Sequence, residues 1–289
     1  MKVAFIGLGA MGYPMARHVA GQHDVIVWNR TTEVAERHAR EYGTRRAEQL
    51  RDCASQEVIL TILPTSDDVD EIVDVLYPKL RRGTLWIDAT SGDPVTSRKT
   101  AGRLAEKGVA FVDAPVTGGT NGAEAGTLTV MVGGKPEDYV RAGEVLKAFG
   151  SRLVHVGEVG AGHAVKAMNN AMLAANMWMA AECLLSLKKL GINLRSALEV
   201  LNSGSGRSFA SQDLLPKRIL DGEWPLTFKL SLHDKDVRIA ASMSHSQRVA
   251  SPMLSLTSQL FTAASKNLGP GADYVEAIKY LAMLNSEEW

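Results

Sequence analysis

The fold is decided near the start of the chain, where residues 3–17 read VAFIGLGAMGYPMAR. Val3-Ala4-Phe5-Ile6 is a short apolar run of the kind that forms a buried strand. It leads directly into Gly7-Leu8-Gly9-Ala10-Met11-Gly12, after which helix-forming residues follow. A strand that passes through a glycine turn into a helix is typical of the first element of a parallel α/β sheet.

The spacing of the three glycines has a physical reason. Gly7 permits the tight turn, Gly9 lets a pyrophosphate approach the backbone, and Gly12 lets helix and strand pack closely. The free N–H groups at the start of the helix then face phosphate groups. We therefore expect a dinucleotide site here rather than a plain tight turn, formed by Gly7, Leu8, Gly9, Ala10, Met11 and Gly12.

The first half of the chain repeats the alternation of strand and helix. Apolar runs lie at residues 25–28, 58–63, 85–87 and 109–112, and helix-like segments such as 33–42 and 69–76 separate them. Two later runs, at residues 128–132 and 153–156, are candidates to extend the same sheet. Continuous apolar strands separated by helices indicate a parallel sheet that is covered on both faces.

The pattern changes near residue 160, beyond which strand-like runs cease. Residues 164–190 read as one long helix rich in Ala, Met and Leu, and shorter helices are expected at residues 195–202, 232–244, 252–266 and 274–284. We therefore predict an α/β domain with a doubly wound sheet at residues 1–160, followed by an all-helical domain at residues 161–289.

Composition excludes several classes of protein. The chain has 289 residues, with 32 Lys and Arg against 32 Asp and Glu. This balance argues against a nucleic-acid partner. The two cysteines predict no disulfide scaffold and make a reduced, cytoplasmic protein the default, and no apolar stretch is long enough to predict a membrane span. The scattered histidines predict no metal site, and neither a Walker A motif nor a GxSxG elbow occurs.

The end of the second predicted strand decides between the two nicotinamide cofactors. NAD sites usually place Asp or Glu there, but this chain has Asn29-Arg30-Thr31. Arg30 can pair with a 2′-phosphate and stack on adenine, and Asn29 and Thr31 can add hydrogen bonds. We therefore expect NADP rather than NAD. The alternative is that Arg30 only lies on a surface turn, and Glu33 nearby weakens the preference.

Ligands of a doubly wound sheet bind beyond the carboxyl ends of its strands. Leu63, Pro64 and Ser91 follow two of these strands and are expected beside the cofactor. Thr117-Gly118-Gly119 follows another, and its free backbone N–H groups suit a substrate carboxylate. The alternative for this last segment is a flexible loop without a ligand.

Lys166 and Asn170 are four residues apart on the long helix and so share one face, which is expected to start at the domain junction. A lysine on an otherwise apolar helix is suited to proton transfer when it is desolvated. A lysine whose ammonium group extends to solvent is the equal alternative. Lys235 belongs to the run His233-Asp234-Lys235-Asp236, for which the residues alone favour a solvated charge cluster.

Four motifs in this order resemble the β-hydroxyacid dehydrogenases, and most closely the 3-hydroxyisobutyrate dehydrogenases. The resemblance covers essentially the whole chain. It rests on the glycine turn with Tyr13-Pro14-Met15-Ala16, on Asp113 to Gly119, on the glycine-rich segment from Gly157 to Asn170, and on Lys235-Asp236. The family usually has Ser where this chain has Thr117, and Ser-Thr where it has Thr90-Ser91.

The resemblance implies a Rossmann domain for NADP and a helical domain for substrate binding and for assembly into a homodimer or homotetramer. It implies that Lys166 is the catalytic acid and base, that Thr117, Gly118, Gly119 and Asn170 bind the carboxylic acid substrate, and that Lys235 contacts both substrate and cofactor.

The reaction expected from the resemblance is hydride transfer between NADP and a small 3-hydroxy acid, above all oxidation of 3-hydroxyisobutyrate to methylmalonate semialdehyde. A reductase of glyoxylate, succinic semialdehyde or tartronate semialdehyde is the alternative enzyme. A non-catalytic NADP-binding sensor is the alternative from another class.

Overall fold

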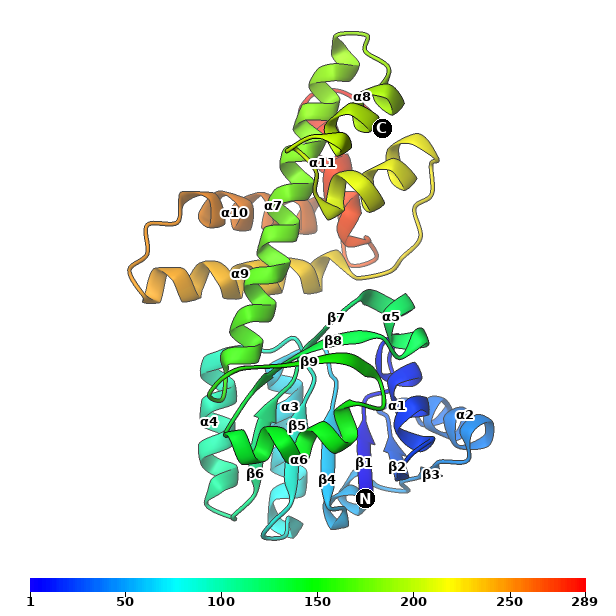
Figure 1. Cartoon of the computed structure of the whole chain (residues 1–289), viewed down its shortest axis with the longest axis vertical. Helices are drawn as coiled ribbons and strands as arrows, with labels where there is room; N and C mark the ends of the chain where they lie inside the picture. Colours follow the sequence, from blue (N-terminus) through cyan, green and yellow to red (C-terminus); the bar gives the residue numbers. More distant parts are fainter. The chain divides into compact units, whose positions relative to one another are not determined.

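The computed structural model describes residues 1–289, and its internal contacts separate them into two units, Met1–Lys166 and Ala167–Trp289. The boundary lies inside helix α7 (Ala161–Lys189), so the first turn of this helix belongs to the first unit. In Figure 1 the colours follow the sequence, from blue in the first strands of the first unit to red in the last helix of the second.

The first unit contains one sheet of nine strands, which follow the order β3-β2-β1-β4-β5-β6-β8-β7, with β9 paired to β8. Its strands are β1 (Lys2–Ile6), β2 (Asp24–Trp28), β3 (Arg45–Arg46), β4 (Val58–Thr61), β5 (Leu85–Asp88), β6 (Ala110–Asp113), β7 (Val116–Thr117), β8 (Leu128–Gly133) and β9 (Gly150–Gly157). The parallel pairing of β3-β2-β1-β4-β5-β6 confirms the predicted doubly wound sheet.

The later strands join this sheet in the reverse direction. β8 pairs antiparallel with β6 and with the two-residue β7, while β9 pairs parallel with β8. The sequence prediction placed β8 and β9 in the sheet but treated all strands as parallel, and it missed β3 and β7. Runs of two residues are too short to show a period, and direction is not encoded in apolar content.

Helices cover both faces of the sheet (Figure 1). They are α1 (Gly12–Ala20), α2 (Thr32–Tyr42), α3 (Ser66–Leu76), α4 (Pro94–Ala105), α5 (Gly119–Ala125) and α6 (Pro136–Leu146), with 3₁₀ turns at Leu50–Ser55 and Tyr77–Lys79. Alternation along β1 sends Phe5 into the core with α1 and α6, and Ile6 into the core with α3. Both side chains are fully buried, so the strand has no solvent face.

The second unit is entirely helical. Its elements are the rest of α7, α8 (Leu194–Ser203), π-helical turns at Ala210–Leu214 and Pro216–Leu220, α9 (Leu230–Ser246), α10 (Pro252–Leu268), a 3₁₀ turn at Tyr274–Glu276 and α11 (Ala277–Leu284). The core forms where Trp178 of α7 packs near Phe261 of α10, together with Val237 of α9 and Ile278 of α11. α9 and α10 lie side by side as a helical pair (Figure 1).

Candidate active site

The glycine turn after β1 combines tight packing with open space. Gly7 has a φ of +101°, and a Cβ atom there would lie 2.2 Å from the carbonyl oxygen of Ile62. A Cβ atom on Gly12 would lie 2.0 Å from the carbonyl oxygen of Gly7. Gly9 is exposed, and beyond its chain neighbours no atom lies within 4 Å of its Cβ position. The fold therefore requires Gly7 and Gly12 but leaves room beside Gly9.

The N-terminus of α1 lies next to this open space. No side chain caps the helix, whose first residue is Gly12, and exposed Ala10 and half-buried Met11 precede it. The Leu8 N–H already donates to Oδ1 of Asn29 at 3.0 Å. The uncapped helix start and the space beside Gly9 suit an anionic group.

The three residues after β2 have different surroundings. Asn29 ties two loops together, because its Oδ1 accepts from Leu8 and its Nδ2 donates to the carbonyl oxygen of Thr31 at 3.0 Å. Arg30 and Thr31 are exposed, and no carboxylate stands at the end of this strand. Asn29 therefore braces the glycine turn, while Arg30 is accessible to a ligand.

Leu63, Pro64 and Ser91 follow β4 and β5, which are neighbours in the sheet. The Leu63 N–H donates to Oγ1 of Thr90 at 3.0 Å, and the Thr90 N–H donates to Oδ1 of Asp88 at 3.1 Å. Leu63 and Ser91 are half-buried, and Pro64 is exposed. The hydrogen bonds through Thr90 hold the two loops together at the carboxyl edge of the sheet.

The Thr117-Gly118-Gly119 segment is partly a strand. Thr117 ends β7 and pairs with Thr129 of β8. Gly118 and Gly119 are exposed, with φ values of +129° and +63°, and they lead into α5. These positive φ values are strained for residues with a side chain, which explains both glycines.

Lys166 is half-buried near the start of α7, and the turn before it is tied to the sheet. The carboxylate of Asp113, at the end of β6, accepts the Gly160 N–H at 2.6 Å and the His163 N–H at 2.8 Å. Burial raises the pKa of Asp113, while nearby His163 and these N–H donors oppose the rise. The backbone that leads to Lys166 is therefore fixed by a fully buried carboxyl group.

In the second unit, one carboxylate holds two of the predicted site residues. Oδ2 of Asp236 accepts from Nδ2 of Asn170 at 2.6 Å, and its Oδ1 lies 3.0 Å from Nζ of Lys235. Asp236 is only 2% exposed, and Asn170 is buried as well. His233 adds a contact between α9 and α7, because its Nε2 lies 2.9 Å from the carbonyl oxygen of Asn170.

This arrangement corrects the expectation of a solvated charge cluster at residues 233–236. His233, Asp234 and Asp236 are all buried, and Asp234 accepts from Oγ1 of Thr262 at 2.6 Å. Charged residues grouped in sequence usually face water, but three of the four residues of this run lie on the buried side of α9.

Comparison with known proteins assigns the family. Residues 2–157 match the NAD binding domain of 6-phosphogluconate dehydrogenase, and residues 160–281 match the domain described as NAD-binding of NADP-dependent 3-hydroxyisobutyrate dehydrogenase. A 2-(hydroxymethyl)glutarate dehydrogenase from Eubacterium barkeri is 34% identical, covering 96% of this chain and 93% of that protein. A 3-hydroxyisobutyrate dehydrogenase from Pseudomonas aeruginosa is 33% identical, with coverages of 90% and 91%. The chain belongs to the 3-hydroxyisobutyrate dehydrogenase family.

Solved structures of similar proteins match almost the whole chain. A 3-hydroxyisobutyrate dehydrogenase from Mycobacterium tuberculosis with L-serine superposes with a TM-score of 0.88 at 27% identity, covering 97% of this chain and 98% of that one. Psf3 in complex with NADP⁺ and 2-OPP has a TM-score of 0.84 at 27% identity, with coverages of 96% and 99%. The protein is therefore a hydroxyacid dehydrogenase that acts on a CH–OH group with a nicotinamide cofactor.

The glycine turn fits the dinucleotide that this dehydrogenase family uses. Space for a pyrophosphate exists beside Gly9, where a side chain would intrude, and the N-terminus of α1 carries no competing cap. No group of three or more His, Cys, Asp or Glu side chains is arranged to hold a metal ion. No helix combines the length and apolar character of a membrane span.

Sequence reasoning missed three residues of this dehydrogenase that support the candidate site. Asp113 and Asp236 were noted only as parts of motifs, and His163, which is fully buried, was counted only among the scattered histidines that predict no metal site. A signal was present for His163, which stands three residues before Lys166. Nothing in the sequence shows that the two carboxylates act as acceptors.

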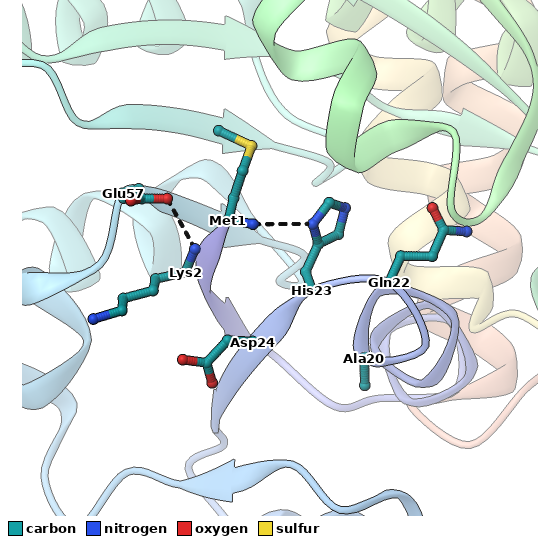
Figure 2. Close-up of a pocket in the computed structure, with 7 residues that line it drawn as sticks. All are labelled: Met1, Lys2, Ala20, Gln22, His23, Asp24 and Glu57. Carbon is teal, nitrogen blue, oxygen red and sulfur yellow. Dashed lines mark hydrogen bonds between the residues drawn. The ribbon is translucent and has the colours of Figure 1, made fainter.

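A pocket of about 450 Å³ lies elsewhere on the first unit (Figure 2). It is lined by Met1, Lys2, Ala20, Gln22, His23, Asp24 and Glu57. These residues surround the amino ends of β1 and β2, at the sheet edge opposite the glycine turn. Ligands of doubly wound sheets bind at the carboxyl edge, so this pocket is not the candidate active site.

Proposed function

We propose that this protein is an NADP-preferring dehydrogenase of 3-hydroxy acids, with 3-hydroxyisobutyrate as its first candidate substrate and methylmalonate semialdehyde as the product. The observation that carries the proposal is the half-buried Lys166, which lies directly after a backbone turn fixed by Asp113. A fixed lysine of this kind suits proton transfer at a hydroxyl group.

Three of the compounds named for the relatives share one chemical unit. 3-Hydroxyisobutyrate, 2-(hydroxymethyl)glutarate and L-serine each carry a hydroxymethyl group on the carbon next to a carboxylate. They differ only in the third substituent, which is a methyl, a carboxyethyl or an ammonium group. We therefore propose a 2-substituted 3-hydroxypropionate as the substrate class, with 2-(hydroxymethyl)glutarate as the second candidate.

The preference for NADP rests on the end of β2. An Asp or Glu there would repel a 2′-phosphate, but the chain has Asn29-Arg30-Thr31. Arg30 is exposed, so its guanidinium group is available for a bidentate contact with the phosphate. Leu8, Gly9, Ala10 and Met11 take the pyrophosphate, and Leu63, Pro64 and Ser91 contact the rest of the cofactor.

The chain's own residues position the substrate and move one proton. A nicotinamide cofactor held by the glycine turn would supply the hydride chemistry. Lys166 takes the proton of the substrate hydroxyl during oxidation and returns it during reduction. Thr117, Gly118, Gly119 and Asn170 hold the carboxylate and hydroxyl in place. Lys235 supplies positive charge for the substrate and cofactor, while Asp236 sets the direction of both Lys235 and Asn170.

Absorbance of the reduced nicotinamide tests the reaction and the cofactor together. The purified protein is mixed with NADP⁺ or NAD⁺ and with each of 3-hydroxyisobutyrate, 2-(hydroxymethyl)glutarate and L-serine. We expect the fastest reduction with NADP⁺ and 3-hydroxyisobutyrate. Reduction of NAD⁺ alone would contradict the proposed role of Arg30. Faster turnover of 2-(hydroxymethyl)glutarate would show that the preferred substrate carries a carboxyethyl group rather than a methyl group.

Substitution of Lys166 tests the mechanism. Lys166→Met is expected to lower kcat by roughly 10²- to 10⁴-fold, the usual contribution of a general acid or base, while NADPH fluorescence still reports cofactor binding. Turnover near the wild-type value would remove Lys166 from the mechanism.

Assembly and location complete the proposal. The second unit exposes large apolar side chains on α7 and α8, including Met172 and Val200, so we propose that it forms a homodimer or homotetramer. Both cysteines are free thiols, in keeping with a reducing, cytoplasmic location. Sedimentation and cell fractionation test these two points.

A further inference from the structure

A buried chain of polar side chains lies just before Lys166. Nδ1 of His163 is 2.6 Å from Oγ of Ser97 in α4, and its Nε2 is 3.8 Å from Oδ2 of Asp88 at the end of β5. The three side chains are almost completely inaccessible to solvent. Nε2 has no hydrogen-bond partner, which is unusual for a buried ring nitrogen.

The order Asp-His-Ser is that of a hydrolytic triad, but burial excludes this chemistry. Ser97 is 4% exposed and His163 is fully buried, so no substrate reaches the hydroxyl group. Oγ of Ser97 also donates to the carbonyl oxygen of Asp93 at 2.9 Å. The interaction therefore serves the interior of the first unit rather than a ligand.

The contacts of His163 fix the start of α7 at separate points. Its N–H donates to Asp113 of β6, its Nδ1 meets Ser97 of α4, and its Nε2 faces Asp88 of β5. Asp88 and Asp113 are register partners in adjacent strands, so both carboxylates lie on the same edge.

Neighbouring glycines allow this close fit. A Cβ atom on Gly92 would lie 2.8 Å from Cε1 of His163, and one on Gly162 would lie 2.4 Å from the carbonyl oxygen of Met131. The first turn of α7 therefore lies directly against the sheet edge, with no space for the helix to rotate toward it.

Lys166 follows His163 by three residues on the same helix. A helix is rigid over one turn, so the rotation of the turn that carries His163 sets the direction of the Cα–Cβ bond of Lys166. We propose that His163, held by Ser97 and Asp88, is a positioning residue that aims Lys166 at the reacting hydroxyl group. This inference rests on the proposed role of Lys166.

Three substitutions at one position separate the contacts. His163→Asn keeps a donor near the Nδ1 position for Ser97 but loses the contact with Asp88, and His163→Gln extends toward Asp88 but loses Ser97. His163→Ala removes both. We expect kcat to fall roughly 100-fold in His163→Ala, the effect of about 1 Å of misplacement, and to recover partly in the other two variants.

Readouts other than turnover distinguish positioning from general support of the fold. The affinity for NADPH and the KM for substrate are expected to change less than about threefold, since His163 is fully buried. The solvent deuterium isotope effect on kcat is expected to rise, because proton transfer through a misplaced Lys166 becomes slower. A matched control is His155→Ala, which removes a histidine of β9 that is bonded to the Gly134 carbonyl oxygen and stacked on Tyr139.

The outcomes distinguish a failure of this inference from a failure of the proposed function. Wild-type kcat in a folded His163→Ala protein overturns it, as do parallel losses in kcat, KM and NADPH affinity. Failure of all three variants to fold also overturns it, because His163 would then be a residue of the core only. Lys166→Met, measured beside them, tests the proposed function itself: an active Lys166→Met enzyme refutes that function whatever His163 does.

Discussion

Two buried carboxylates, one in each unit, hold predicted site residues or the backbone beside them in different ways. Asp113, in the first unit, accepts backbone N–H groups of Gly160 and His163. Asp236, in the second unit, binds the side chains of Asn170 and Lys235. Both are at most 2% exposed, so burial alone does not distinguish them.

What each carboxylate binds predicts what its loss will affect. A carboxylate that accepts backbone N–H groups holds a segment in place, and its loss leaves buried donors unsatisfied. A carboxylate that binds functional side chains orients them, and its loss leaves the backbone intact. Loss of the Asp113 carboxylate is thus expected to lower mainly the stability of the protein, and loss of the Asp236 carboxylate mainly its turnover.

The largest expected effect is on the stability of Asp113→Ala. Two buried N–H groups lose their acceptor at about 1–3 kcal/mol each, so the free energy of unfolding should fall by about 2–6 kcal/mol. Urea denaturation measures it. Asp113→Asn keeps one acceptor and should lose less. An unchanged urea midpoint in Asp113→Ala would contradict the idea that Asp113 stabilises the fold by accepting backbone N–H groups.

The glycine turn shows the same division between fold and ligand within six residues. Gly12→Ala forces a Cβ atom against the Gly7 carbonyl oxygen and should destabilise the protein by about 1–3 kcal/mol. Gly9→Ala meets no atom of the chain and should change stability by less than about 0.5 kcal/mol. It should nevertheless weaken NADPH binding roughly tenfold, because its methyl group enters the pyrophosphate space.

Thermal melts and NADPH titrations of both glycine variants measure this difference. The control is Gly102→Ala, because Gly102 lies in α4 and also has no atom near its Cβ position. Normal NADPH affinity in Gly9→Ala would place the pyrophosphate elsewhere.

Asp236→Asn should lower kcat/KM about 10- to 100-fold, since it weakens charge-assisted hydrogen bonds worth about 1.5–3 kcal/mol. Steady-state kinetics measure the loss, and the melting temperature should change little. Asp234→Asn is the matched control, because Asp234 lies on the same helix and pairs with Arg238 and Thr262 instead. If Asp236→Asn lost stability but kept its kcat/KM, Asp236 would support the fold rather than turnover.

The smallest effect concerns pH. Burial raises the pKa of Asp113 above the ordinary 3.8, so the folded protein holds this proton more tightly than the unfolded chain. The stabilisation from this proton is complete below pH 3.8 and is lost as the pH rises through the folded pKa. An Asn side chain does not titrate, so Asp113→Asn does not lose stability in this way. Its melting temperature should therefore rise relative to that of the wild type as the pH increases from 3.8 through the folded pKa. A constant difference would exclude a raised pKa.

Much of the fold could be predicted because its signals are local. The strand at Val3–Ile6, the glycine turn and the long α7 each follow from residues that are adjacent in sequence. The reversal of β8 could not, because pairing direction depends on partners far along the chain. The bounds of α4 and α6 were not predicted, although each begins at a proline, Pro94 or Pro136, as the predicted α10 does at Pro252.

The candidate site was predictable where a residue type limits the chemistry. The spacing of Gly7, Gly9 and Gly12 predicts the glycine turn, and the position of Lys166 on an apolar helix makes it a candidate. The acceptors Asp113 and Asp236 depend on contacts across 47 and 66 positions, respectively, which no local pattern records. The roles of the predicted site residues stay predictions until the variants above are measured.

The position of the boundary between the units has a consequence for building chimeras. The first unit ends at Lys166, shortly after the start of α7, and Asp113 accepts from Gly160 just before the helix and from His163 in its first turn. A helical unit taken from a relative is therefore best joined after Lys166. A junction at Gly160 would set a foreign first turn of α7 against Asp113, Ser97 and Asp88, and so replace the contacts that His163 makes with them.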